Sequence, residues 1–209
     1  MNYNKVIFER AFGISSQLIA CDCPELVFTG RSNAGKSSLL NRLFNRKALA
    51  RVSSMPGKTA TINFYRLDDI RFVDLPGYGY AKVAKDERRR WDELIGGYFA
   101  QDRDVALVFL LLDMRHAPSA DDLTMANYLI EREMPFIILL TKSDKLNKTK
   151  RQERLKAFVE ELPCGEEITM LPVSSETGEG IETLRDIIED VVADAAPAQD
   201  DAGDGRPNY

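Results

Sequence analysis

Residues 30–37 combine two glycines, a lysine and a hydroxyl side chain at a spacing that suits a chain of phosphates. Glycines let the backbone wrap around phosphate oxygens, so that successive N–H groups can point inward as an anion-binding nest. A lysine at the seventh position can reach the β- and γ-phosphates, and a hydroxyl at the eighth can ligate Mg²⁺. The residues are Gly30, Arg31, Ser32, Asn33, Ala34, Gly35, Lys36 and Ser37, a complete G-x-x-x-x-G-K-[ST] sequence.

The flanking residues place this loop between a strand and a helix. The apolar run 26–28 precedes it, and the helix-forming run 38–43 follows it directly. The first turn of a helix offers unpaired N–H groups and the positive end of its dipole, and both favour an anion. An ordinary glycine turn is the alternative, and the strand–loop–helix order argues against it. We therefore predict that residues Gly30 to Ser38 bind the phosphates of a nucleotide.

A carboxylate at the end of another apolar run can serve the same site. Asp74 closes the run 70–73 and is followed by Leu75, Pro76 and Gly77. The carboxylate can hold Mg²⁺ through a water, and the Gly77 N–H can reach a γ-phosphate. On their own these four residues would indicate a turn at a strand end. Behind a phosphate loop they predict the metal-binding side of the site.

The residues Thr141, Lys142, Ser143 and Asp144 end the apolar run 136–140 and can recognise a base. The Asp144 carboxylate can accept two hydrogen bonds, from the N1–H and the exocyclic amino group of guanine. Adenine has no such pair of donors, so the unpaired carboxylate would disfavour it by several kcal/mol, on the order of 10³-fold. The Lys142 stem can lie across the plane of the base.

The end of the next predicted strand, 168–173, can complete the base site. Val173, Ser174 and Ser175 lie there, and their backbone N–H groups are placed to contact the guanine O6 atom. This placement follows because ligands of α/β sheets sit at the carboxyl ends of the strands.

The connection 46–60 contains a further candidate metal ligand. It shows no sustained periodicity, and a long irregular connection in a compact domain is usually functional or disordered. Thr59 is the best candidate for a mobile threonine that ligates Mg²⁺ only when the γ-phosphate is present. Thr61 is the alternative, but a predicted strand already begins there. The predicted nucleotide-binding residues of this stretch are Gly57, Lys58, Thr59, Ala60 and Thr61.

Apolar and amphipathic runs alternate along most of the chain, which is typical of a parallel sheet with helices on both faces. Two of the predicted strands are joined only by Asp68-Asp69, which is too short for a crossover, so these strands must pair antiparallel. We predict an α/β fold of the three-layer P-loop NTPase class, with one antiparallel strand in a mostly parallel sheet. The predicted strands are 5–12, 25–30, 61–67, 70–75, 105–113, 135–141 and 168–173, and the predicted helices are 36–45, 86–100, 120–132, 149–162 and 180–194.

Length and composition indicate one main domain. The 209 residues are 44% hydrophobic, enough for one sizeable core, and the net charge of −5 argues against a generally basic nucleic-acid binder. We expect residues 1–24 to form a strand and lead-in packed on the nucleotide-binding domain, 25–194. The stretch 195–209 is rich in Ala, Pro, Gly and Asp, and we expect a disordered acidic tail.

The three cysteines indicate free thiols. Cys21-x-Cys23 has no second pair or nearby histidine, and Cys164 stands alone, so neither a disulfide framework nor a zinc site is expected. Free thiols suit a reducing cytoplasm. We see no signal-peptide pattern and no apolar run near the ~20 residues that span a bilayer. We therefore expect a cytoplasmic monomer with no membrane partner.

In order, these motifs resemble the EngB (YsxC/YihA) family of bacterial GTPases, which belongs with the Era, EngA and TrmE proteins. The resemblance covers roughly residues 5–194 and includes GRSNAGKSS at 30–38, PGKT at 56–59, DLPGYGY at 74–80, TKSD at 141–144 and the serine pair 174–175. It implies a small G domain, binding of GTP and GDP with Mg²⁺, and slow hydrolysis. It also implies a switch role in assembly of the large ribosomal subunit, with the subunit precursor or its RNA as partner, and a need for the protein in cell division and septation.

Two alternatives to this function stay open at the level of the sequence. One is a GTP-dependent scaffold of the division apparatus with no ribosomal role. The other is a P-loop ATPase or kinase, against which the Asp144 and Ser174 motifs weigh.

The chain departs from the commonest GTPase pattern in two places. Thr141 stands where most such proteins carry asparagine, a change shared by the EngB relatives, so guanine selection rests mainly on Asp144. Tyr78 stands where Ras-like proteins carry a water-positioning glutamine, and a phenol cannot orient water in that way, so unaided turnover should be slow. In Era- and TrmE-like proteins an asparagine at the position of Asn33 helps to hold a monovalent cation. We therefore hypothesise that K⁺ accelerates hydrolysis; a purely structural Asn33 is the alternative.

The resemblance and the residues together assign roles to five positions. Lys36, Asn33 and Thr59 are the predicted catalytic residues, and Ser37, Thr59 and Asp74 the predicted metal ligands. Because Thr59 and Gly77 lie in segments that γ-phosphate contacts can order, we predict nucleotide-sensitive switches at 46–60 and 77–86.

Two groups of basic residues can face RNA or form solvated surfaces. One flanks the second switch segment at 82–90. The other spans 142–156 and holds seven lysines and arginines against two acidic residues.

Overall fold

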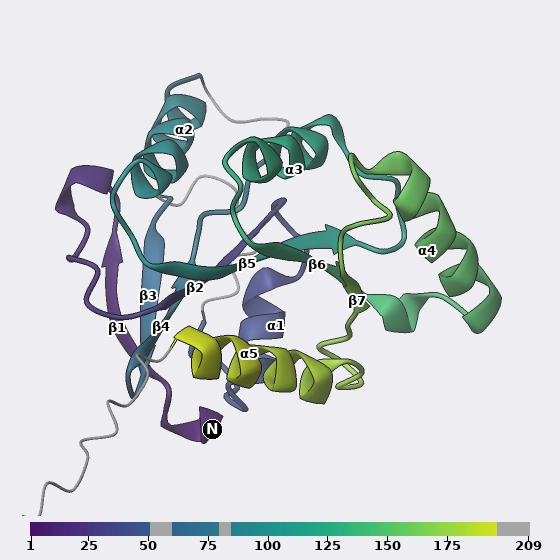
Figure 1. Cartoon of the computed structure of the whole chain (residues 1–209), viewed down its shortest axis with the longest axis horizontal. Coiled ribbons are helices and arrows are strands. Elements are labelled where there is room, and N and C mark those ends of the chain that lie inside the picture. Colours follow the sequence, from purple (N-terminus) through teal and green to yellow (C-terminus); the bar gives the residue numbers. More distant parts are fainter. Residues whose placement is uncertain (51–59, 80–84, 196–209) are drawn as a thin grey trace, which may run out of the picture.

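A single seven-stranded sheet organises the chain in the computed structural model, which describes residues 1–50, 60–79 and 85–195. The strand order is β1-β3-β4-β2-β5-β6-β7 (Figure 1). The strands are β1 (Ile7–Phe12), β2 (Glu25–Gly30), β3 (Ile62–Leu67), β4 (Ile70–Asp74), β5 (Val105–Asp113), β6 (Phe136–Thr141) and β7 (Met170–Pro172).

Only β3 runs against its neighbours. It pairs antiparallel with both β1 and β4, whereas β2, β4, β5, β6 and β7 pair parallel. The two-residue link 68–69 joins β3 to β4, and Asp68 adopts a φ of +50° in this tight turn. The predicted hairpin and the predicted single antiparallel strand are therefore confirmed.

Helices cover both faces of the sheet because successive residues of each strand point to opposite sides. Leu26 and Phe28 of β2 pack toward α1 and α5, whereas Val27 packs toward α2, α3 and α4 (Figure 1). The two apolar clusters and the sheet form the three layers of the predicted P-loop NTPase fold. The helices are α1 (Lys36–Leu43), α2 (Lys85–Phe99), α3 (Ala120–Glu131), α4 (Lys148–Glu161) and α5 (Ile181–Ala195).

The first 24 residues add β1 to the open side of β3. A short 3₁₀ helix, η1 (Tyr3–Lys5), precedes this strand, and η2 (Ser15–Gln17) follows it. Tyr3 is buried, and its hydroxyl donates to the Arg185 carbonyl on α5 at 3.4 Å. The predicted tail lies outside the described residues beyond Ala195 and remains a prediction. No helix in the described ranges is both long and apolar enough to cross a bilayer.

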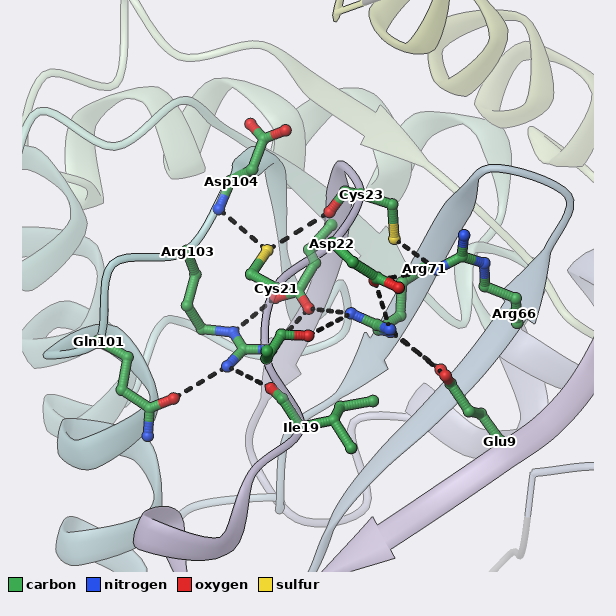
Figure 2. A network of polar contacts seen from close by, with 12 residues as sticks. Glu9, Ile19, Cys21, Asp22, Cys23, Arg66, Arg71, Gln101, Arg103 and Asp104 are labelled. Atoms are coloured by element: carbon green, nitrogen blue, oxygen red, sulfur yellow. Dashed lines mark hydrogen bonds and ion pairs between the residues drawn. The ribbon is translucent and has the colours of Figure 1, made fainter.

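A closed ionic network lies where β2, β4 and β5 begin. Glu25 is 0% exposed, and its carboxylate accepts from Arg71 at 3.1 Å, from Arg103 at 2.7 Å and from the Tyr98 hydroxyl at 2.6 Å. Arg71 also donates to Glu9 on β1, and the lead-in residues around Cys21 close over the cluster (Figure 2). Since these strands are parallel, the network occupies the amino ends of the strands, the opposite end from the predicted nucleotide site.

Candidate nucleotide-binding site

The phosphate loop fills the gap between the end of β2 and the start of α1, as predicted. Gly35 is the N-cap of α1 with a φ of +92°, and Asn33 adopts +64°, a left-handed conformation that asparagine tolerates. At Gly30 a Cβ atom would stand 2.8 Å from the Leu111 carbonyl oxygen, so a larger residue would push the loop away from β5. Glycine is thus required at position 30 because the loop packs closely on β5, and at position 35 because the backbone adopts a left-handed conformation.

Two predicted phosphate- and metal-side residues contact each other directly. The Lys36 ammonium forms an ion pair with Asp74, and both side chains are largely buried. The other Asp74 oxygen accepts from the Asn63 amide at 3.3 Å. Lys36 can reach phosphates, and Asp74 can face a metal, only if this ion pair opens. Ser37 lies in the first turn of α1, half-buried, with its backbone at the helix N-terminus.

The base-side carboxylate is oriented by neighbours from two loops. Asp144 Oδ1 accepts from the Ser174 hydroxyl at 2.7 Å, and Oδ2 pairs with the Lys145 ammonium at 2.9 Å. The hydrogen bond from Ser174, followed by that from Lys145, lowers the pKa of Asp144 below its usual value. The carboxylate is therefore an ionised acceptor at neutral pH, as recognition of two guanine donors requires.

The loop after β7 uses most of its backbone amides internally. The N–H groups of Val173 and Ser174 donate to Leu140 and Glu179 carbonyls, and those of residues 176–178 donate to the side chain or carbonyl of Ser174. Among residues 173–178 of the described chain, Ser175 is the one whose N–H donates to no acceptor in the protein. The predicted contact with guanine O6 therefore narrows to this amide.

Thr141 ties the base-side loop to the phosphate loop. Its buried hydroxyl lies 2.6 Å from the Ala34 carbonyl oxygen and 3.1 Å from that of Leu112. Lys142 adds a second link, because its ammonium donates to the Asn33 carbonyl at 2.7 Å. The tether that asparagine supplies in the commonest GTPase pattern is thus made here by the threonine hydroxyl and the neighbouring lysine.

The residue that holds Lys142 in place was not predicted from the sequence. Asp113, the last residue of β5, accepts from the Lys142 ammonium at 2.9 Å and from Arg115 at 2.7 Å. Burial favours a higher pKa for Asp113, but these hydrogen bonds outweigh it and hold the pKa far below the usual range. The sequence did contain a sign of this residue, since Asp113 is a carboxylate at the carboxyl end of an apolar run, like Asp74. Two further residues were not predicted and lie in no comparable pattern: Asn63, which donates to Asp74, and Glu179, whose carboxylate accepts from the Ser143 hydroxyl at 2.7 Å.

Several predicted residues lie at the edge of the described chain or outside it. Gly57, Lys58 and Thr59 fall outside the described residues, as do residues 80–84 of the second predicted switch. Ala60 and Thr61 lead into β3, and the Thr61 hydroxyl donates to Asn63 at 3.1 Å. Leu75 and Pro76 are buried beside the phosphate loop.

The second basic group is partly neutralised. Arg151 pairs with Glu179 at 2.5 Å and Arg154 with Glu161 at 2.8 Å. The lysines at 148, 150 and 156 are exposed. With the Lys142–Asp113 pair, three of the seven basic side chains of this group thus pair with acidic residues that lie outside the 142–156 segment.

A phosphate loop, a metal-side aspartate and a base-side aspartate on this mixed sheet are the features of a P-loop GTPase. Residues 25–142 match the family model described as 50S ribosome-binding GTPase. A probable GTP-binding protein EngB from Lachnoclostridium phytofermentans is 43% identical over 190 residues, 90% of this chain and 94% of that protein. The chain belongs to the EngB family of GTP-binding proteins and is a GTPase.

Further relatives agree with this assignment. A probable EngB from Oceanobacillus iheyensis is 48% identical over 158 residues, 75% of this chain and 81% of that protein. The crystal structure of a probable EngB protein matches with a TM-score of 0.68 at 26% identity, over 81% of this chain and 99% of that one. Aquifex aeolicus Era, bound to GDP and aluminium fluoride, is similar at a TM-score of 0.58 and 17% identity, over 80% of this chain and 56% of that one, which shows the fold alone.

Proposed function

We propose that this protein is a guanine-nucleotide switch that binds GTP and GDP, hydrolyses GTP slowly with Mg²⁺, and acts in assembly of the large ribosomal subunit in the cytoplasm. The observation that carries the nucleotide part is the ionised Asp144 carboxylate, held by Ser174 on the same side of the sheet as the phosphate loop. Three free thiols support a reducing compartment.

Calorimetric titration with four nucleotides tests the base preference. We expect GDP and GTP to bind, and ADP and ATP to bind on the order of 10³-fold more weakly, because adenine leaves the carboxylate without donors. Equal binding of ATP and GTP, or binding of neither, would contradict the proposal.

The donor set at the metal side suits Mg²⁺. Ser37 offers a hydroxyl oxygen and Asp74 a carboxylate, the hard oxygen ligands that this ion prefers, and Thr59 would be the third ligand. When bound, the ion supplies positive charge to the β- and γ-phosphate oxygens. The burial of Asp74, at 4% exposed, favours a specific contact over a loosely held counter-ion.

Hydrolysis should be slow because the residue after Gly77 is engaged elsewhere. The Tyr78 hydroxyl donates to Asp122 at 2.9 Å, so the phenol is directed at α3. Lys36 would stabilise the charge of the transferred phosphoryl group, and Asn33 lies exposed on the phosphate loop where it can contribute to a K⁺ site. Turnover at saturating GTP should be faster in KCl than in NaCl; equal rates would remove the K⁺ hypothesis.

The ribosomal role is supported by the family model, whose description names binding to the 50S ribosome. Sucrose-gradient sedimentation with ribosomal subunits should show co-migration that differs among GDP, a GTP analogue and no nucleotide. Identical profiles in all three conditions would instead favour the scaffold of the division apparatus. We propose that the septation role is a consequence of impaired ribosome assembly; depletion should then lower mature large subunits before division stops.

A further inference from the structure

The segment after β4 is held against the phosphate loop through its backbone. The Tyr78 N–H donates to the Gly30 carbonyl at 3.2 Å, and the Ser32 N–H donates to the Tyr78 carbonyl at 2.7 Å. These bonds form a parallel bridge between residues 31 and 78 that continues the β2–β4 ladder beyond the ends of both strands. The first residues after β4 therefore have a defined position beside the phosphate loop.

Gly77 lies in direct contact with the same loop. A Cβ atom on Gly77 would stand 3.1 Å from Ser32 Cα and 3.2 Å from Ser32 N. Only glycine lets the two backbones approach this closely without displacing one of them. Gly77 thus lies next to the phosphate loop, where the proposed function requires its N–H to meet a γ-phosphate.

The side chain of Tyr78 adds a second attachment, to helix α3. Tyr78 is 3% exposed, and its hydroxyl donates to Asp122 Oδ1 at 2.9 Å. Asp122 Oδ2 accepts from the Ser119 N–H at 2.8 Å, and the Asp122 N–H donates to the Ser119 hydroxyl oxygen at 3.3 Å; these two bonds are the capping box of α3. The Ser119 hydroxyl also donates to Asp122 Oδ2 at 2.7 Å. Burial, followed by the nearby Asp122 charge, raises the pKa of Tyr78 well above its ordinary value, so the phenol remains a donor.

We propose that Tyr78 is a positioning residue for the γ-phosphate: the tie between its phenol and Asp122 holds Gly77 where its N–H can bind that group. The inference rests on the proposed guanine-nucleotide function. A donor that is already in place binds more tightly, because no ordering is needed when the ligand arrives. GDP has no γ-phosphate, so the tie matters for GTP and not for GDP.

Tyr78→Phe tests the tie because it removes only the hydroxyl. We expect the affinity for a non-hydrolysable GTP analogue with Mg²⁺ to fall about five-fold, the size of one lost hydrogen bond, while the GDP affinity stays the same. Asp122→Ala should lower the analogue-to-GDP ratio in the same direction. In the double variant the ratio should fall no further than in the more affected single variant, since both changes break one contact.

Tyr98→Phe is the matched control. Tyr98 is 0% exposed and donates to the Glu25 carboxylate at 2.6 Å, so it loses an equivalent buried bond at the far end of the sheet. Both tyrosine variants should lower the melting temperature, and only Tyr78→Phe should change the analogue-to-GDP ratio. An unchanged ratio in Tyr78→Phe, an equal loss for both nucleotides, or the same change in Tyr98→Phe overturns the inference. If the unmodified protein binds neither nucleotide, the proposed function itself fails, and the inference with it.

Discussion

The two ends of the sheet use charged residues in opposite ways. At the amino ends of β2 and β4, Glu25 and Arg71 are buried, and both carboxylate oxygens of Glu25 accept hydrogen bonds. At the carboxyl ends, Asp144 pairs with the half-exposed Lys145, and Lys36 pairs with Asp74, the residues that we propose for phosphate and metal binding. We therefore expect the charges at the amino ends to matter mainly for stability, and those at the carboxyl ends mainly for ligand binding.

The largest expected effect is a loss of stability when a charge is removed from the closed end, the ionic network at the amino ends of β2, β4 and β5. Arg71→Leu leaves Glu25 buried with one fewer cation, and we expect the free energy of unfolding to fall by about 3–5 kcal/mol in urea titrations. The GDP affinity of the folded variant should change less than about two-fold, because the site lies at the other end. Arg66→Leu is the control: its pair with the exposed Asp22 should contribute less than about 1 kcal/mol. Similar losses in both variants would contradict the account.

Removing a charge at the nucleotide end should have the converse effect. Lys36→Ala should weaken GDP binding by about 100-fold or more, because charge-assisted hydrogen bonds to phosphate are lost. The melting temperature should fall by less than in Arg71→Leu, because alanine leaves room for water to reach the Asp74 carboxylate and the Asn63 amide still donates to it. Lys148→Ala, which changes an exposed lysine on α4, should leave GDP affinity unaltered. Retention of tight GDP binding by the Lys36 variant would show that the loop does not hold phosphates.

A smaller loss of affinity is expected when the tether between Thr141 and the phosphate loop is removed. This loss should differ from that of Tyr78→Phe in the nucleotides that it affects. Thr141→Val keeps the shape of the side chain and removes the hydroxyl that contacts the Ala34 carbonyl. We expect GDP and a GTP analogue to lose affinity equally, by about five- to ten-fold, because the tether supports the loop for both nucleotides. Thr141→Ser should restore binding. A loss confined to the GTP analogue would place the role of Thr141 elsewhere.

The smallest expected effect is a difference in the alkylation rates of the cysteines. It measures how well the closed end excludes a reagent from solution. Burial raises the pKa of Cys23 from 9.0 to about 12, so the folded thiol keeps its proton, and the stability from this shift is complete below pH 9 and lost as the pH rises toward 12. At pH 8 iodoacetamide should modify the exposed Cys164 rapidly and Cys23 slowly, as measured by mass spectrometry of the folded protein. Equal rates would show that the closed end opens readily.

The two ends of the sheet also differ in how much of each could be predicted from the sequence. The strands and helices followed from alternating periodicity, and their observed limits differ from the predicted ones by one or two residues at most ends. The phosphate loop, Asp74 and Asp144 were predicted because each lies in a short local pattern at a strand end. Such patterns are contiguous, so no knowledge of tertiary contacts is needed to find them.

The closed end could not be predicted, because its partners are far apart in the sequence. Glu25 meets Arg71 and Arg103 only after three strands have assembled, and each of these residues alone resembles an ordinary surface charge. The contact between Tyr78 and Asp122 was missed for the same reason, since 44 residues separate its two members. Long-range pairs of this kind carry no local signal.

The most direct test of the central claim is the base preference of Asp144→Asn, measured by calorimetry with GDP and xanthosine diphosphate. Xanthine carries a carbonyl where guanine carries its amino group, so the asparagine amide can donate where the carboxylate could only accept. We predict that the unmodified protein prefers GDP and that the variant prefers xanthosine diphosphate. A variant that keeps the original preference for GDP would contradict the claim that this carboxylate reads the base.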